Sequence, residues 1–407
     1  MKLQILVRRA VIALLLPSWA QAQMNSPLDQ SGSPGAARTV SANAFNPAVG
    51  VIFNGTYGRL SEDPATYVLP GFALGPETGP GERGFSLGES EINMNANVDD
   101  KFFGNLTIAL GSDNTANVEE VFIRTIGLQE GLTLKAGRFF SGIGYLNERH
   151  AHVWDFVDAP LPYRAMLANQ LGDDGIQVRW LAPIESFLME FGAEAFRGDG
   201  FPAGGAANKG NGAHSFFVHV GGDLGVNNSW RAGVSRLRAR ADNRETGDET
   251  NPDLFTGKSD LNIADFIWKW APNGNSTITN FKFQAEYFQR TEKGSFTSIS
   301  PPVTDDVDGK QSGWYAQAIY QFMPRWRVGL RYDEVKADPV SAALQGAVLD
   351  PAGHKPTRES AMIDFSNSEV SRVRLQFNRD QSRPDVVDNQ VFLQYIMSIG
   401  AHGAHRF

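Results

Sequence analysis

The sequence contains no cysteine among its 407 residues. This absence excludes a disulfide-stapled scaffold, a thiolate metal site, an iron–sulfur protein and a cysteine nucleophile. Positive charge is also in deficit, because 37 Lys and Arg stand against 45 Asp and Glu, and a formal charge of -8 argues against nucleic acid as a partner. No internal run reaches the roughly 18 apolar residues that a membrane-spanning helix needs. Any membrane-embedded part would therefore consist of strands.

The N-terminus has the features of a secretory signal peptide. A basic start precedes the apolar stretch 10–16, and residues 20–22 (AQA) form a small-x-small cleavage site. We expect residues 1–22 to direct export and to be removed. Residues 23–46 are rich in Ser, Gly, Ala, Asn and Pro, which is typical of a flexible leader, here in the periplasm. The remaining residues, 47–407, form the expected folded domain.

Apolar and polar residues alternate along this domain, which is the pattern of strands with one apolar face. The alternation is clearest in segments 92–98, 176–180, 281–287, 326–332 and 373–377. In each of them one face is apolar and the other is polar or charged. A soluble exported β-sandwich or lectin-like protein would show the same alternation, so a second feature is needed to choose between the two classes.

Aromatic residues at the ends of the expected strands favour a membrane barrel. Trp326 and Tyr332 bracket one strand, and Trp268 with Trp270 close another. Such girdles mark the two membrane interfaces of a transmembrane β-barrel. We count about sixteen strands, each with room for the 9 to 11 residues that span a membrane. The predicted fold is an all-β, transmembrane antiparallel barrel.

The connections between these strands alternate in length, as in bacterial outer-membrane barrels with short periplasmic turns and longer outer loops. The longer connections are expected at 61–83, 143–171, 242–257, 293–310 and 337–357.

Four segments resemble a group of Gram-negative outer-membrane proteins related to the phosphate-selective porins O and P. They are 84–110 (GFSLGESEINMNANVDDKFFGNLTIAL), 118–125 (VEEVFIRT), 134–161 (LKAGRFFSGIGYLNERHAHVWDFVDAPL) and 398–407 (SIGAHGAHRF). Members of this group are often labelled zinc-regulated TonB-dependent outer membrane receptors. The resemblance implies a passive or substrate-biased porin in the outer membrane, with a zinc-linked metal-uptake receptor as the alternative. Residues 23–46 are too few for the plug of a TonB-dependent receptor.

The expected partners follow from the barrel and the resemblance. They are outer-membrane lipid, small solutes or ions, and the assembly machinery that recognises a closing strand ending on an aromatic residue, here Phe407. Analogy with porins also suggests a homotrimer.

If the apolar strand faces contact lipid, the opposite faces line the lumen. The basic residues then expected to line the pore are Arg124, Lys135, Arg179, Lys282, Arg325, Arg327, Arg331, Arg372 and Arg374. Rings of Arg or Lys favour anions in a pore, and the arginine fork matches phosphate and carboxylate groups. In the alternative interpretation these side chains pair with Glu91, Glu286 and Asp364 across the lumen. We therefore predict a channel for small hydrophilic solutes, with an anion bias under the first interpretation only.

The connection 143–171 follows the fifth expected strand, where sixteen-stranded porins fold a loop inward to narrow the pore. It contains His150, His152, Asp155 and Asp158, which are residue types that bind zinc. We predict the constriction here. A zinc site made by these four residues and hydrogen bonds from them to the barrel wall are the two alternatives, and no cofactor other than zinc is expected.

An enzyme is the least favoured class. Residues 84–88 (GFSLG) match the Gly-x-Ser-x-Gly string of hydrolases, but that motif needs a strand-to-helix elbow and here it opens a polar-faced strand. No His is in clear register with a Ser, as a barrel phospholipase would need. His402 and His405 form a second, looser metal candidate near the terminus. We predict a protein without enzymatic activity.

Overall fold

The computed structural model describes residues 47–76, 78–111, 115–205, 210–247 and 250–400. The expected signal peptide, the leader and the tail residues His402, His405 and Phe407 lie outside these residues. The strands are β1 (Ala48–Leu60), β2 (Gly84–Leu87), β3 (Ser90–Asn97), β4 (Phe102–Leu110), β5 (Ala116–Thr125), β6 (Leu132–Phe140), β7 (Gly172–Leu181), β8 (Leu188–Phe196), β9 (Ala213–Leu224), β10 (Asn228–Thr246), β11 (Asp253–Trp270), β12 (Asn280–Ile299), β13 (Pro302–Met323), β14 (Trp326–Ala337), β15 (Thr357–Ser368), β16 (Ser371–Gln381) and β17 (Asp388–Gly400).

Helical structure is sparse. One α-helix, α1, spans Leu161–Leu167, and single 3₁₀ turns occur at η1 (Pro64–Thr66), η2 (Gln129–Gly131), η3 (Ala151–Val153), η5 (Pro272–Gly274) and η6 (Ala342–Leu344). None of the helices in the described ranges has the length and apolar character to cross a membrane.

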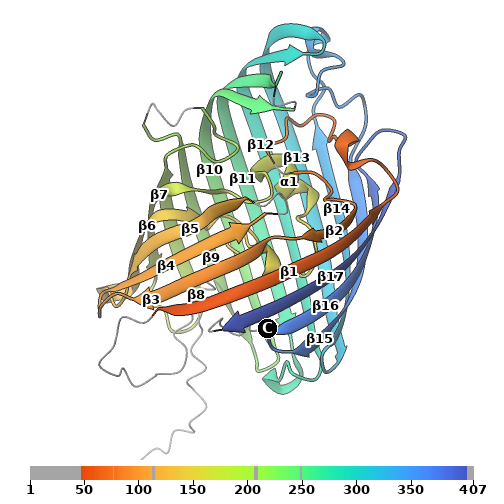
Figure 1. Ribbon diagram of the computed structural model, residues 1–407. Helices are drawn as coiled ribbons and strands as arrows, with labels where there is room; N and C mark the ends of the chain where they lie inside the picture. Colours follow the sequence, from red (N-terminus) through yellow and green to blue (C-terminus); the bar gives the residue numbers. More distant parts are fainter. Residues whose placement is uncertain (1–46, 77, 112–114, 206–209, 248–249, 401–407) are drawn as a thin grey trace, which may run out of the picture.

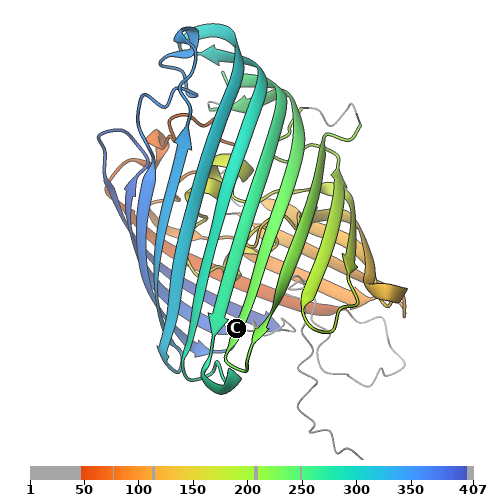
Figure 2. The ribbon, with the colours of Figure 1, turned by 180° about the vertical axis from the view of Figure 1, so that it is seen from behind.

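The strands form one closed antiparallel barrel (Figures 1 and 2). Closure is made by β1, which pairs with β17 on one side and with both β2 and β3 on the other. Because β2 and β3 pair with successive stretches of β1 and are separated only by Gly88 and Glu89, they occupy one position in the wall. The barrel therefore has 16 strand positions, which confirms the predicted fold.

The wall is much taller on one side than on the other (Figure 2). Strands β10 to β13 have 18 to 22 residues, whereas β1 to β8 have at most 13. The expectation of long loops at 242–257 and 293–310 was wrong, because strand pairing continues through most of both stretches. Their polar composition belongs to strands that extend past the apolar band, where the outer face is wet as well as the inner one.

The outer face of the barrel is apolar, as the alternation predicted. Exposed residues include Val178 on β7, Leu330 on β14 and Leu393 on β17. Two aromatic pairs lie along β14: the Trp326 ring, at the first residue of the strand, is 4.8 Å from Phe365, and the Tyr332 ring, six residues further on, is 5.2 Å from Trp314. These residues form the expected girdles.

The interior of the barrel is filled in part by the chain between β6 and β7. Figure 1 shows α1 inside the wall, and the helix contacts β12, β13 and β14. All of its residues are buried. They share an apolar cluster with Leu69 and Phe72 from the connection after β1 and with Ala203 from the connection after β8. A core thus lies inside the lumen, and the connection that carries α1 is its centre.

Candidate functional site

Residues 141–171, here called the strap, connect β6 to β7 and lie inside the barrel. Because β2 and β3 share one position, β6 is the fifth strand of the wall, where the inward loop was predicted. Asn147 ties the two ends of the strap together. Its amide Nδ2 donates to the carbonyls of Ser141 at 2.8 Å and Leu171 at 2.9 Å, and its Oδ1 accepts from Leu171 N at 2.8 Å.

The first part of the strap is anchored on Glu286 of β12. The carboxylate accepts hydrogen bonds from the backbone N–H groups of Tyr145 at 3.0 Å and Leu146 at 3.2 Å, and from the phenols of Tyr163 and Tyr315. Burial and the negative charge of Glu286 raise the pKa of Tyr163 well above its usual value, so that its phenol remains a donor. Four donors on one buried carboxylate fix the strap against the tall wall.

Asp155 anchors the middle of the strap on the same wall. Its carboxylate forms ion pairs with Lys282 and with Arg327, whose Nη1 is 3.1 Å away, and it accepts from Gln317. Burial opposes its ionisation, but Lys282 and Arg327 outweigh burial and hold the pKa of Asp155 far below its usual range.

Asp158 is the most heavily contacted carboxylate of the strap. It lies 2.6 Å from Arg331 Nη2, 2.8 Å from Arg358 Nη1 and 3.2 Å from Arg164 Nη2. It also accepts from the amides of Gln376 and Asn378. Burial opposes the charge, but Arg358 and Arg331 hold the pKa of Asp158 far below its usual range.

Strap carbonyls complete this contact. Arg372 Nη2 donates to the His152 carbonyl at 2.7 Å, and Arg374 Nη2 donates to the Trp154 carbonyl at 2.8 Å. Cations outnumber carboxylates where the strap meets this wall. The seven cations are Lys282, Arg164, Arg327, Arg331, Arg358, Arg372 and Arg374. All of them except Arg372 form ion pairs with Asp155, Asp158, Asp333 or Asp364, and the carboxylates of Glu286 and Asp380 also lie on this wall.

The remaining predicted pore residues are dispersed. Arg124 lies over the Phe103 ring and Lys135 over the rings of Phe122 and Phe139. Arg179 pairs with Glu148 of the strap and with Glu190. These three point inward, but each is held by a local partner.

Arg325 does not line the lumen, which corrects the prediction. It lies exposed in the turn between β13 and β14, with a left-handed backbone (φ 73°). The alternation around it suggested an inward position, but the turn begins after Met323 and the strand resumes at Trp326.

The two histidines of the strap face the opposite side of the barrel. His150 Nδ1 is 3.0 Å from Glu119 Oε2 and 3.4 Å from Glu91 Oε2, and its Nε2 is 3.1 Å from Glu120 Oε2. His152 Nδ1 is 2.6 Å from Glu91 Oε1. The structure thus separates the four predicted zinc ligands, with His150 and His152 in this acidic cluster and Asp155 and Asp158 among arginines.

The acidic cluster has the donor set of a divalent-metal site. One ligand atom each from Glu91, Glu119 and His150 lies within 4.8 Å of the others. Burial opposes the charge on His150, but Glu91 and Glu119 outweigh it and raise the pKa of His150 well above its usual value. Burial and the neighbouring His150 lower the pKa of His152. A protonated His150 thus fills the place that a cation would take.

Sequence reasoning did not identify Glu119, Glu120 or Arg358 as site residues. Glu120 and Arg358 occupy buried positions in the alternation of their strands, and this was the available signal. Glu119 has no partner in the β4–β5 register, because the register shifts at this residue, and strand alternation does not predict such a β-bulge. The sequence does not give the path of the strap, and only this path shows which of the many polar side chains of the lumen the strap contacts. Ser86 of the Gly-x-Ser-x-Gly string lies within β2, and the chain passes from there into β3 without a helix.

Comparison with known proteins gives one relative in sequence and many in fold. No protein-family model matches the chain. A protein of Aquifex aeolicus (strain VF5), described as an uncharacterized protein, is 31% identical over 400 residues, covering 90% of this chain and 81% of the relative. The chain belongs to the family of this Aquifex protein.

Solved structures with the same fold are outer-membrane porins. OmpF of Salmonella typhi, in complex with daunomycin, has a TM-score of 0.55 at 10% identity, covering 88% of this chain and 99% of that chain. An anion-selective porin from Comamonas acidovorans has a TM-score of 0.52 at 12% identity, covering 87% and 99%. The outer membrane channel DcaP of Acinetobacter baumannii has a TM-score of 0.52 at 11% identity, covering 87% and 97%. These structures place the chain in the porin fold.

Proposed function

We propose that the protein is an outer-membrane, porin-like channel through which small hydrophilic solutes diffuse, with a preference for anions. The observation that carries the proposal is the inward strap, which narrows a closed sixteen-strand barrel beside a wall where cations outnumber carboxylates. The relation to phosphate-selective porins is part of this proposal, because arginine and lysine groups at a constriction favour anionic solutes.

The cations best placed to act on a passing ion are those that keep some exposure. Lys282 and Arg327 are 17% and 20% exposed, whereas Arg331, Arg358 and Arg374 are at most 1% exposed. Lys269 lies directly across from Lys282 in the strand register and is also partly exposed. Lys282 pairs with Asp155 of the strap, and Lys269 adds a second positive charge beside it that a passing anion would meet.

Reversal potentials in a salt gradient across a planar bilayer test the anion preference. Lys269→Glu reverses one charge at the strap without removing an anchor of Asp155 or Asp158, so we expect the reversal potential to shift toward cation preference. Arg325→Glu is the matched control, because it makes the same charge change in an exposed turn. Equal shifts in both variants, or no shift in Lys269→Glu, would overturn the proposed filter.

We infer a trimeric assembly through the short wall, β1 to β8. This wall exposes large apolar side chains, among them Phe85, which is 90% exposed. One solved structure of the same fold is the trimer form of OmpT from Vibrio cholerae (TM-score 0.51, 11% identity). A buried subunit contact there would leave the tall wall facing lipid.

A second candidate function is divalent-metal binding at the strap, favoured by the cluster of Glu91, Glu119 and His150. Ligands on Zn²⁺ at about 2.0 to 2.1 Å lie roughly 3.3 Å apart, and the donor atoms around His150 Nδ1 are 3.0 and 3.4 Å from it. Glu119 Oε1 is buried without a hydrogen-bond partner in the described structure. Contacts from Glu120 and His152 would orient the ligands, as outer partners do in metal sites.

Calorimetric titration with Zn²⁺ alone tests this candidate. Glu119→Gln together with His150→Gln removes two donors and should weaken zinc binding at least tenfold. Asp155→Asn is the control, because it changes a strap carboxylate that lies among cations on the other wall. Unchanged affinity in the double variant would reject the metal site, and the channel proposal would stand independently.

A further inference from the structure

The outer surface of the tall wall carries a group of cations just beyond the apolar band. This outer basic patch consists of outward side chains on four adjacent strands, namely Arg236, Arg238, Arg240, Lys258, Lys293 and Lys310. Its members alternate along the strands with buried, inward residues. The patch stands out because the whole chain is acidic, with a formal charge of -8.

The strand register places three of these cations in one row. Arg240 is directly opposite Lys258, and Lys258 is directly opposite Lys293. Like charges in directly opposed positions destabilise a sheet, so a row of three is unfavourable unless an anion neutralises it. Lys293 pairs with Asp308 at 2.9 Å, and Arg236 pairs with Asp260 at 3.6 Å, but within the described chain neither Arg240 nor Lys258 has a carboxylate at ion-pair distance.

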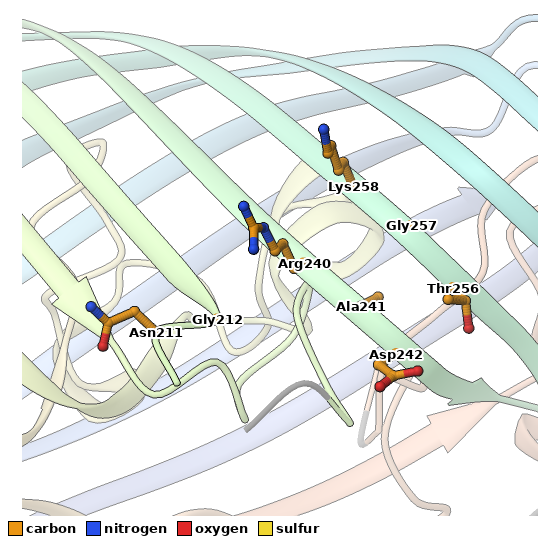
Figure 3. Close-up of a pocket in the computed structure, with 8 residues that line it drawn as sticks. All are labelled: Asn211, Gly212, Arg240, Ala241, Asp242, Thr256, Gly257 and Lys258. Atoms are coloured by element: carbon orange, nitrogen blue, oxygen red, sulfur yellow. The ribbon is translucent and has the colours of Figure 1, made fainter. Parts of the chain in front are cut away.

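Arg240 and Lys258 also border a pocket of about 360 Å³, together with Asn211, Asp242 and Thr256. Figure 3 shows the Arg240 and Lys258 side chains projecting side by side from neighbouring strands. The two cations therefore border the same surface hollow, which Asp242 also lines.

The height of the patch identifies the kind of anion. The outward row that contains Tyr287 and Trp314 marks the edge of the apolar band. Arg236, Arg238 and Arg240 lie beyond this row at steps of two residues, so the last of them is roughly 20 Å further along the strand. A strand tilt of about 45° converts this to roughly 14 Å of height. The cations thus cover a layer that is thicker than the headgroup region of an ordinary phospholipid leaflet.

We propose that the outer basic patch binds the phosphate groups of a phosphorylated glycolipid headgroup in the outer leaflet, with Arg240 and Lys258 as the central contacts. Such a headgroup carries anions at several depths, which matches cations arranged in successive rows. Clustered cations near a membrane surface attract anionic headgroups in the same way. The inference rests on the proposed outer-membrane location and is independent of the selectivity of the channel.

Binding of purified lipopolysaccharide to the refolded full chain in neutral detergent micelles tests the proposal. Arg240→Gln with Lys258→Gln should weaken binding at least tenfold, and raising the salt concentration should weaken binding to the native chain. The matched control is Lys355→Gln with Arg379→Gln, which removes the same charge at the same end of the barrel, where Glu334 and Glu359 already pair with these cations. We expect this control to bind within twofold of the native chain.

Three results would overturn the proposal. They are equal affinity of the double variant and the native chain, equal binding of dephosphorylated lipopolysaccharide, and full competition by millimolar inorganic phosphate, which would assign the patch to free phosphate. Reversal potentials of the same double variant separate this test from the channel proposal. An unchanged potential with lost lipid binding supports the patch, whereas a changed potential with retained lipid binding assigns these cations to the ion path.

Discussion

Arg358 donates from Nη1 to Asp158 Oδ2 over 2.8 Å, although the two residues are 200 positions apart in the chain. Arg358 also contacts Asp333, and its Nη2 donates to the Ala159 carbonyl of the strap. Neither Arg358 nor Asp333 has side-chain exposure to solvent. This buried ion-pair group joins the strap to β15 and β14, and it fixes the position of the strap against this wall.

Asp158→Asn should release the strap from this wall. The substitution leaves the guanidinium groups of Arg331, Arg358 and Arg164 with less negative charge, and losing one partner of a buried ion pair costs about 3 to 5 kcal/mol. We expect a lower free energy of unfolding in urea and larger, noisier conductance steps. Identical steps in the variant and the native chain would show that the strap does not limit the passage.

A compensating pair separates the role of charge from that of packing. Asp158→Leu with Arg358→Met replaces ionic groups by apolar ones of similar size, which is often neutral for stability. The pair should recover part of the unfolding free energy lost in Asp158→Asn. Glu334→Gln, which removes a partly exposed carboxylate paired with Lys355, should leave conductance unchanged and stability nearly so.

Gly144→Ala should destabilise the strap by steric conflict at the Glu286 anchor. Gly144 has φ +66°, and an added Cβ would lie 2.5 Å from Glu286 Oε2 and 2.9 Å from the Tyr163 hydroxyl. Gly127 is a matched control, because its φ is +69° and a Cβ there would have no neighbour within 4 Å. Both variants carry the backbone cost of about 1 kcal/mol. Any additional loss of unfolding free energy in Gly144→Ala therefore reports the steric conflict at the Glu286 anchor. Equal losses in urea unfolding would contradict it.

The Asp155 and Asp158 anchors of the strap should resist acid. The pKa values of Asp155 and Asp158 are held far below their usual range in the folded chain, mainly because Lys282 and Arg358 outweigh burial. A lowered folded pKa contributes stability that is present above the unfolded value and is lost only as the pH falls through the folded value. Both carboxylates should therefore stay ionised between pH 7 and about pH 4.5, and their contacts should cause no change in single-channel conductance over that interval. Progressive widening over that interval in the native chain, absent from Asp158→Asn, would contradict the assignment.

Phe85→Glu should dissociate the proposed trimer. A charge in place of an apolar side chain that is 90% exposed removes contact area and introduces a desolvation penalty at a subunit contact. Native gel migration or light scattering in detergent should report a monomer. Leu330→Glu, on the tall wall at 67% exposure, should leave the assembly size unchanged. A trimer that persists in Phe85→Glu would place the contact elsewhere.

The fold was predictable because strand alternation is a local property. Segments such as 326–332 specify one apolar face by themselves, and the count of such segments gives the barrel. The strap was also placed correctly after the fifth strand. The lengths of the tall strands were not predicted, because the polar composition of 242–257 and 293–310 is typical of loops and their pairing partners cannot be identified locally.

The site was only partly predictable because its contacts are long-range. In the sequence, Asp155, Asp158, His150 and His152 are all residue types that can bind a metal. The course of the strap places the two aspartates and the two histidines on opposite walls. The partners of Asp158 come from β14, β15 and β16. The local sequence of the strap does not identify these partners.

We propose that solutes pass between the strap and the cationic wall. The native chain has no cysteine, so Lys269→Cys places a single thiol in the lumen. Stepwise modification of this thiol by an anionic and by a cationic thiosulfonate during single-channel recording is the most direct test. We expect a discrete drop in conductance with either reagent, and we expect the anionic group also to reduce the anion preference. An unchanged current after complete modification would contradict the claim, because ions would then cross by a path that does not pass this wall.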